Sequence, residues 1–264
     1  MKHSKWTAIA LLGSTLLLCG RPSVSRADDF TLGDVLTDTR LYFTAPLRWD
    51  ESDWLFLGGS LTAIAVAHEF DGRVRAHFAP AGAAGLTGSD SNSIRDAIPA
   101  ASLVVGTWLA SEVTNDSFAN TEAYTMVEAA GFSSVTAEAL KYAAGRERPD
   151  QTTDPNDWRA AGSSFPSLHA TAAFAVGTVF AESGSDDYRW FRRVVGYGMA
   201  TATVYLRLRD NQHWLSDTVA GAALGIASGR FVTHRRLDRA HAWNLSFAPS
   251  QDGGLMMTFS MITN

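Results

Sequence analysis

The sequence predicts an all-α protein, a bundle of about six core helices with a short C-terminal β-hairpin. At 264 residues and 46% hydrophobic content, the chain can bury one sizeable core. Apolar residues recur with helical spacing through most of the chain and alternate strictly only near its end. These two observations favour a single helical domain over residues 28–240 and a separate tail over residues 241–264.

Six stretches combine helical periodicity with helix start or stop signals. They are residues 52–69, 91–112, 122–144, 167–182, 187–208 and 213–235. We expect Gly131 to weaken the third helix. A short helix or arm is expected at residues 32–47, and the Gly- and Ala-rich residues 70–90 are expected to form a loop.

In residues 241–264 the spacing of apolar residues changes from helical to alternating. Trp243, Leu245 and Phe247 alternate with smaller or polar residues, residues 249–254 supply turn chemistry, and the alternation returns from Leu255. This pattern predicts a β-hairpin, which we expect to pack on the bundle.

Residues 1–27 resemble a secretory signal peptide. Two lysines precede an uncharged run, and Ser25-Arg26-Ala27 provides a small-x-small cleavage site. A lipoprotein signal at Cys19 is disfavoured by the bulky Leu18. Cleavage would also remove Cys19, the one cysteine of the chain, so neither disulfides nor thiol chemistry is expected. We expect a periplasmic or secreted protein.

The chain is acidic, with a formal net charge of −5. The leader holds four basic residues and no acid, so its removal makes the mature chain more acidic still. This balance argues against nucleic acid as a partner and against electrostatic docking on anionic lipid. Basic residues that cluster in spite of this acidic net charge therefore indicate a functional site.

Uncharged stretches are too short to cross a bilayer. The longest cover residues 54–67, 97–111, 194–206 and 218–229, all below the roughly 18–20 residues that a crossing needs. We favour a water-soluble bundle, with membrane association or peripheral membrane contact as the alternative. A ridge of Gly221, Gly225 and Gly229 would let a neighbouring helix approach closely in either setting.

The stretch from Arg207 to Asp217 carries the first candidate site residues. His213 and Asp217 are four residues apart, so on a helix the carboxylate could accept the proton of one imidazole nitrogen and leave the other basic. Arg207 offers a guanidinium suited to a phosphate or another tetrahedral oxyanion. Alone, this pattern is more typical of a surface pair or a helix cap.

Two upstream segments add groups that bind anions. Lys141 and Arg148 close the helix that Pro149 terminates, where cations also favour the helix dipole. Residues 150–164 form a polar loop that could rim a site. Ser167 then occupies an N-cap position, so its hydroxyl and the exposed amides could hold an anion, unless it is an ordinary cap.

Other site chemistries fit less well. His169, His213 and Asp217 could ligate zinc by type, but the neighbouring lysine and arginines would repel a cation. Ser167 with His213 and Asp217 could form a hydrolase triad, but the Gly-x-Ser-x-Gly elbow is missing. An oxyanion pocket accommodates all these residues.

The three segments together resemble the superfamily of type 2 phosphatidic acid phosphatases, bacterial class A acid phosphatases and vanadium haloperoxidases. Its motifs match as Lys141 to Arg148-Pro149, Pro166-Ser167-Leu168-His169, and Leu206-Arg207 to His213 to Asp217. The resemblance covers residues 91–235. Leu168 stands where the family has Gly, and Leu206 where it has Ser.

The resemblance implies a mechanism. His213 would attack phosphorus and form a phosphohistidine, and Asp217 would orient its ring. His169 would protonate the leaving oxygen and then activate water. The phosphoryl oxygens would be held by Lys141, Arg148, Ser167, Arg207 and the amide of Leu168.

The function expected is therefore that of a metal-independent phosphatase without a cofactor, acting on phosphomonoesters or on lipid phosphates and diphosphates. Two alternatives remain. One is a haloperoxidase that uses vanadate in place of phosphate, and the other is a non-catalytic oxyanion-binding bundle. The oligomeric state is not legible in the sequence.

Overall fold

The computed structural model describes residues 32–78, 90–184, 186–236, 244–249 and 255–260. The expected signal peptide lies outside the described residues and stays a prediction.

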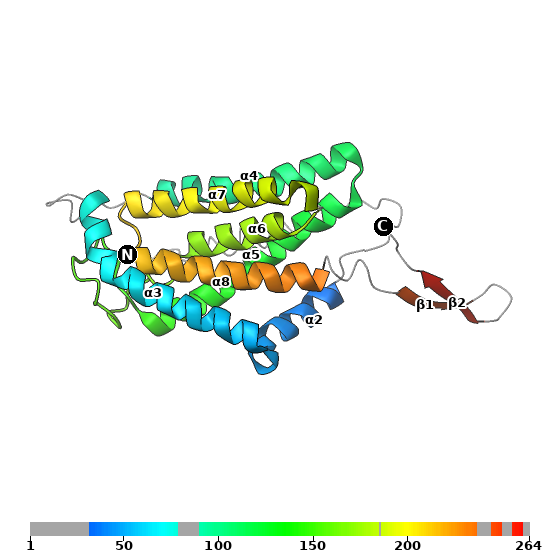
Figure 1. Ribbon diagram of the computed structural model, residues 1–264, viewed down its shortest axis with the longest axis horizontal. Coiled ribbons are helices and arrows are strands. Elements are labelled where there is room, and N and C mark those ends of the chain that lie inside the picture. Colours follow the sequence, from blue (N-terminus) through cyan, green and yellow to red (C-terminus); the bar gives the residue numbers. More distant parts are fainter. Residues whose placement is uncertain (1–31, 79–89, 185, 237–243, 250–254, 261–264) are drawn as a thin grey trace, which may run out of the picture. The chain divides into compact units, whose positions relative to one another are not determined.

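The described part of the chain before residue 237 consists of helices and the loops that join them, which confirms the all-α prediction (Figure 1). The elements in order are α2 (Leu32–Phe43), η1 (Ala45–Arg48), α3 (Glu51–Phe78), α4 (Asp90–Thr114), α5 (Ser117–Ala144), α6 (Leu168–Glu182), η2 (Asp186–Tyr188), α7 (Arg189–Arg209) and α8 (Leu215–Arg236). The six expected core helices correspond to α3 through α8.

Two local expectations were wrong, and a third stays a prediction. Helix α3 continues to Phe78, so the first part of the expected loop 70–90 is helical, and residues 79–89 lie outside the described chain. Helix α5 runs unbroken through Gly131, where a Cβ would meet nothing within 4 Å, and the expectation that Gly131 weakens this helix stays a prediction. Helix α8 begins at Leu215, two residues after His213.

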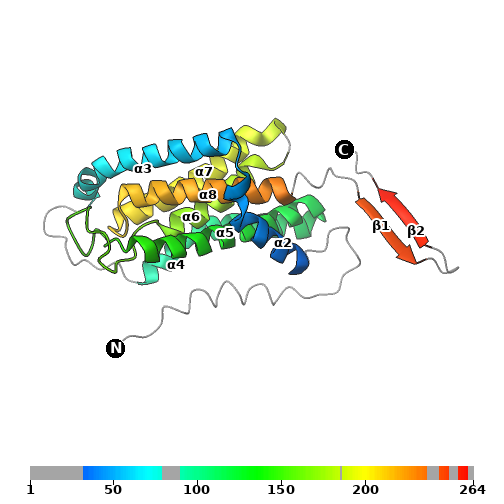
Figure 2. The same cartoon turned by 90° about the horizontal axis from the view of Figure 1, so that it is seen from below.

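Helix α6 forms the centre of the bundle and packs against α4, α5, α7 and α8 (Figures 1 and 2). Its small and β-branched side chains are buried on all sides, as its lack of charged residues before Glu182 requires. Val176 and Val179 join Met126 and Phe132 of α5 in the apolar core. A central helix of small residues lets its neighbours converge closely on it.

The glycine ridge of α8 makes one of these close approaches, as expected. A Cβ at Gly225 would lie 2.3 Å from the carbonyl oxygen of Thr171, and one at Gly221 would lie 2.7 Å from that of Ser167. Only glycine allows the two backbones to meet in this way. The contact fixes the start of α8 against the start of α6.

The expected hairpin is formed by β1 (Asn244–Pro249) and β2 (Leu255–Ser260). The strands are antiparallel, with Asn244 opposite Ser260 and Pro249 opposite Leu255. The packing of the hairpin on the bundle stays a prediction.

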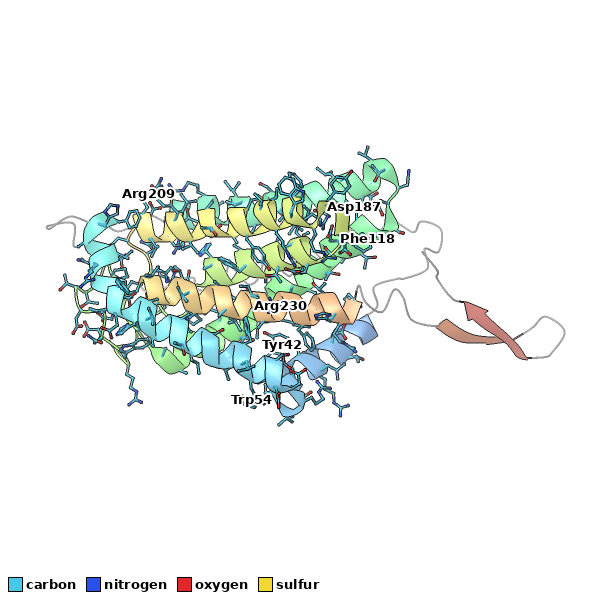
Figure 3. The ribbon with its side chains drawn as sticks, in the orientation of Figure 1. Tyr42, Trp54, Phe118, Asp187, Arg209 and Arg230 are labelled. Carbon is cyan, nitrogen blue, oxygen red and sulfur yellow. The ribbon has the colours of Figure 1, made fainter. Side chains whose placement is uncertain are left out.

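One described segment, Ile94–Thr114 of α4, is long and apolar enough to cross a membrane by length and composition. This corrects the expectation from uncharged runs, which were broken by Arg95 and Asp96. Large apolar side chains are also exposed on three outer helices (Figure 3). They include Trp54, Leu55, Leu61 and Val66 on α3, Ile98, Val105 and Leu109 on α4, and Val194 and Tyr205 on α7.

Candidate active site

The three motifs meet where α5 and α7 end and α6 and α8 begin (Figures 1 and 2). Lys141 lies in the last turn of α5 and Arg207 in the last turn of α7. His213 lies in the turn between α7 and α8, and Asp217 in the first turn of α8. The turn is tight because Asn211 adopts a left-handed conformation, with φ of 56°, which Asn tolerates better than most residues.

His213 is buried and lies among positive charges. Burial lowers its pKa well below the usual value, and the charges of Arg207, Lys141, Arg148 and His169 lower the pKa further. The ring is therefore neutral at ordinary pH, with a basic nitrogen. A neutral imidazole surrounded by cations can act as a nucleophile towards an anionic group that those cations attract.

The hydrogen bond expected between His213 and Asp217 is not present. Nδ1 of His213 lies 3.6 Å from Oδ2 of Asp217 and has no hydrogen-bond partner within the described residues. The pair does not share a helical face, because His213 precedes the helix. Nδ1 nevertheless faces the carboxylate, so the other nitrogen, Nε2, is the one directed elsewhere.

The carboxylate of Asp217 is fully engaged. Its Oδ1 accepts from Nη1 of Arg146 at 2.6 Å, and its Oδ2 accepts from the hydroxyl of Ser164 and from the amide of Trp214 at 2.9 Å. Burial raises the pKa of Asp217, whereas the charge of Arg146 and these hydrogen bonds lower it. The donors thus favour an ionised carboxylate in a site without water contact.

Arg146 is a site residue that the sequence analysis missed. It is completely buried, and its Nη2 pairs with Oδ2 of Asp71 on α3 at 2.7 Å. Its guanidinium also lies over the rings of Trp158, at 4.5 Å, and Trp214, at 5.3 Å. Nothing in the sequence between Lys141 and Arg148 distinguishes this arginine from a solvated one, since its partner is 75 residues away.

Arg207 pairs with the carboxylate of Asp96, a second acidic residue that the sequence did not identify as part of the site. Its Nη1 donates to Oδ2 of Asp96 on α4 at 2.8 Å, and its side chain is 1% exposed. Its Nε has no hydrogen-bond partner within the described residues. Asp96 therefore fixes one end of the guanidinium and leaves donor capacity for an oxyanion.

The two cations of the first motif are oriented by different segments: Lys141 by the loop that follows α5, and Arg148 by the turn between α7 and α8. Nζ of Lys141 donates to the carbonyl of Ser163 at 2.8 Å. Burial and the charge of Arg148 lower the pKa of Lys141 to about 8. Arg148 donates to Oε1 of Gln212 at 2.9 Å, and Gln212 in turn donates to Asp150 at 3.3 Å.

Ser167 occupies the N-cap position of α6 but its hydroxyl makes no capping hydrogen bond. The hydroxyl is buried and has no partner within the described residues. The reading of Ser167 as an ordinary cap is therefore wrong. Leu168 and His169 follow, half-buried, on the first turn of α6, where backbone amides favour an anion.

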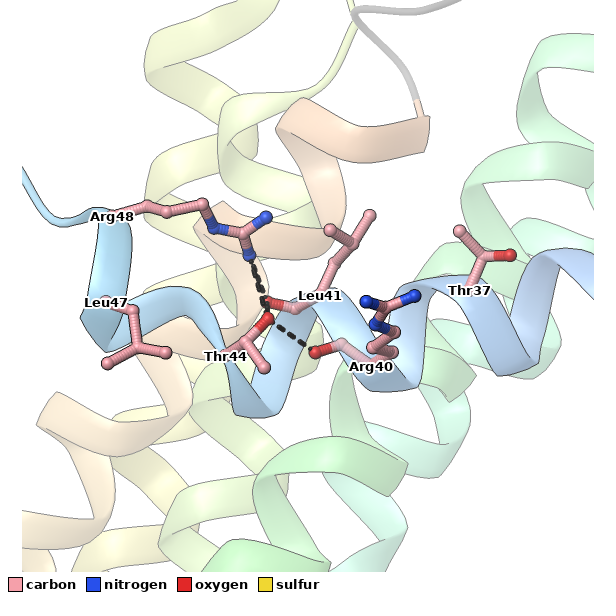
Figure 4. Close-up of a pocket in the computed structure, with 6 residues that line it drawn as sticks. All are labelled: Thr37, Arg40, Leu41, Thr44, Leu47 and Arg48. Atoms are coloured by element: carbon pink, nitrogen blue, oxygen red, sulfur yellow. Dashed lines mark hydrogen bonds between the residues drawn. The ribbon is translucent and has the colours of Figure 1, made fainter.

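Two surface cavities lie elsewhere. One, of about 540 Å³, is bordered by α2 and η1, with Arg40, Leu47 and Arg48 among its lining residues (Figure 4). The other, of about 420 Å³, lies beside the candidate site and is lined by His68 and Asn156 among others. Neither cavity is lined by the motif residues.

Comparison with protein families matches residues 122–240 to the PAP2 superfamily, and this range contains all three motifs. Residues 122–240 belong to the PAP2 superfamily. The chain is similar to part of the lipid A 1-phosphatase of Porphyromonas gingivalis, with 40% identity over 129 residues. The alignment covers 47% of this chain but 27% of that protein, so the chain matches about a quarter of its relative. No solved structure matches the chain significantly.

Proposed function

We propose that the protein is a phosphatase that hydrolyses a phosphate ester of a lipid through a phosphohistidine on His213. The observation that supports it most directly is the buried, neutral ring of His213 among the charges of Lys141, Arg148 and Arg207. A site built only to bind an oxyanion has no need of an unprotonated imidazole among these cations. The proposal needs no metal ion, because fixed cations would neutralise the phosphoryl group.

In the first step, the lone pair of Nε2 of His213 attacks phosphorus while the bond from phosphorus to the ester oxygen breaks. His169 gives its proton to that oxygen, so the alcohol leaves neutral. Lys141, Arg148, Arg207, Ser167 and the amide of Leu168 hold the three other oxygens. Asp217 faces Nδ1 and stabilises the positive charge that the ring acquires.

In the second step, His169 accepts a proton from water while the water oxygen attacks phosphorus. The nitrogen–phosphorus bond breaks, its electrons return to His213, and inorganic phosphate leaves. His169 is then protonated again for the next turnover. The same residue acts as acid and then as base.

A lipid substrate is supported by the similar lipid A 1-phosphatase and by the exposed apolar side chains of α3, α4 and α7. We infer membrane contact through these side chains, since the acidic chain has no general electrostatic attraction to anionic lipid. Bound protein should sediment with lipid vesicles and be released by detergent. Release by high salt alone would contradict an apolar contact.

The test of the mechanism is release of inorganic phosphate from p-nitrophenyl phosphate and from a dispersed lipid phosphate, with EDTA present. We expect His213→Ala to abolish release and His234→Ala, on the exposed far end of α8, to retain it. Loss of wild-type activity in EDTA, or activity in His213→Ala, would contradict the mechanism. Oxidation of halide with vanadate and peroxide, without phosphate release, would favour the haloperoxidase.

A further inference from the structure

Asp217 belongs to a buried cluster that extends beyond the PAP2 region. Asp71, on α3, accepts from Nη2 of Arg146 at 2.7 Å, and Arg146 donates to Asp217 at 2.6 Å. Asp71 also accepts from the amide of Ser216 at 2.8 Å and from its hydroxyl at 2.6 Å. Ser216 precedes Asp217 directly, so Asp71 fixes the backbone that carries the carboxylate as well as the guanidinium that contacts it.

The cluster holds two negative charges and one positive charge, and the side chains of Asp71, Arg146 and Asp217 are all 0% exposed. His68 borders the cluster: its Nδ1 lies 3.0 Å from Oδ2 of Asp71 and 3.2 Å from Nη2 of Arg146, and its Nε2 lies 3.1 Å from Oδ1 of Asn156. Among Asp71, Arg146 and Asp217, one guanidinium is shared by two carboxylates.

We propose that Asp71 and Arg146 are positioning residues that hold Asp217 towards His213, and that the sharing of Arg146 between the two carboxylates leaves Asp217 able to stabilise the phosphohistidine cation. Arg146 alone would neutralise Asp217. Because Asp71 shares Arg146, the carboxylate keeps its attraction for a cation on Nδ1. This inference rests on the phosphohistidine mechanism, but the charge balance exists without substrate.

The groups that act on His213 come from every side of the site. The negative charge comes from α8 and α3, and the positive charge from α5, α6, α7 and the loop. They are Asp217, Asp71, Arg146, Lys141, His169, Arg207 and Arg148. A substitution in the cluster leaves the last four in place, so it tests the cluster alone.

The experiment compares Asp71→Asn, Arg146→Gln and the double variant. Relative to the wild type, the charge of the cluster rises by one in Asp71→Asn, falls by one in Arg146→Gln, and is unchanged in the double variant. We measure the pKa of His213 by NMR of the labelled ring, without substrate. It should fall in Asp71→Asn, rise by about one unit or more in Arg146→Gln, and return towards the wild-type value in the double variant.

Kinetics give the second readout. Asp71→Asn should slow formation of the phosphohistidine about tenfold while the Kd for inorganic phosphate changes less than about threefold, and the double variant should recover much of the rate. The control is Asp38→Asn, which removes a buried carboxylate that pairs with Arg235 at the far end of α8 and should leave both readouts unchanged.

A purely structural role for the cluster predicts a different pattern. The proposal is overturned if the losses of rate in the two single variants add in the double variant. It is also overturned if both single variants shift the His213 pKa equally in the same direction, or if Asp38→Asn loses as much rate as Asp71→Asn. If the wild type releases no phosphate, the phosphatase proposal fails, and the order of the three pKa values still decides the role of the cluster.

Discussion

Replacing Asp96 with Asn would remove the negative charge opposite Arg207. Arg207 is 1% exposed and Asp96 completely buried, so the change leaves a buried guanidinium without its counter-charge. Breaking such a pair costs about 3–5 kcal/mol, and we expect the lower end, because Asn can still accept one hydrogen bond. For a domain of this size, about 3 kcal/mol lowers Tm by roughly 6–12 °C.

Phosphate should reverse part of this loss, because it would supply negative charge to Arg207. Ligand at about 100 times its Kd stabilises a protein by about 2.7 kcal/mol, and the gain should be larger for Asp96→Asn than for the wild type. Thermal unfolding with and without phosphate measures both effects.

The matched control is Asp210→Asn. Asp210 pairs with Arg95 and Arg209, whose side chains are 40% and 43% exposed, so its loss should cost less than about 1 kcal/mol. The reasoning is refuted if Asp96→Asn is as stable as this control, or if phosphate raises Tm equally in the variant and the wild type.

Three further changes test the packing and the site. Gly225→Val should destabilise the protein by about 1–3 kcal/mol in denaturant unfolding, because its Cβ would lie 2.3 Å from the carbonyl of Thr171; Gly58→Ala, with nothing within 4 Å, should not destabilise it. Phosphate affinity measured by calorimetry should weaken as pH rises through about 8, where Lys141 loses its proton. Lys141→Arg should move this transition to higher pH. If the dependence of phosphate affinity on pH is the same in the variant and the wild type, Lys141 does not bind phosphate. Ser167→Ala should weaken phosphate binding by about 1 kcal/mol without lowering Tm, since its hydroxyl has no partner in the described residues; a loss of stability would show that the hydroxyl serves the fold.

The helices were predictable because their signals are local. Periodicity predicted residue 144 as the end of α5, where Gly145 caps the helix in a left-handed conformation before Pro149 is reached, and the alternation near the C-terminus defines the two strands. The end of α3 was missed, because Gly72 and the glycines beyond it suggested a loop, although Arg73 to Phe78 contain good helix formers. Local composition could not show whether the glycines or the helix-forming residues would determine the structure of this segment.

The motif residues were predictable as a group because their spacing follows the three helix ends that meet at the site. Their partners were not. Asp71 and Asp96 lie 75 and 111 residues from the arginines they hold, and an acidic residue on an apolar helix gives no sign of which cation it will meet. The same limit applies to Asp217, whose hydrogen bonds go to Arg146, Ser164 and Trp214 rather than to His213.

The position of Asp71 and Asp96 has a consequence for any attempt to shorten or recombine this protein. Both lie before residue 122, where the match to the PAP2 superfamily begins. A fragment limited to the matched residues would retain every motif, yet Arg207 would lose the carboxylate of Asp96 and Arg146 would keep only one of its two carboxylates, that of Asp217. A chimaera that grafts the motifs onto another scaffold must therefore bring α3 and α4 along, or supply two carboxylates at the same places.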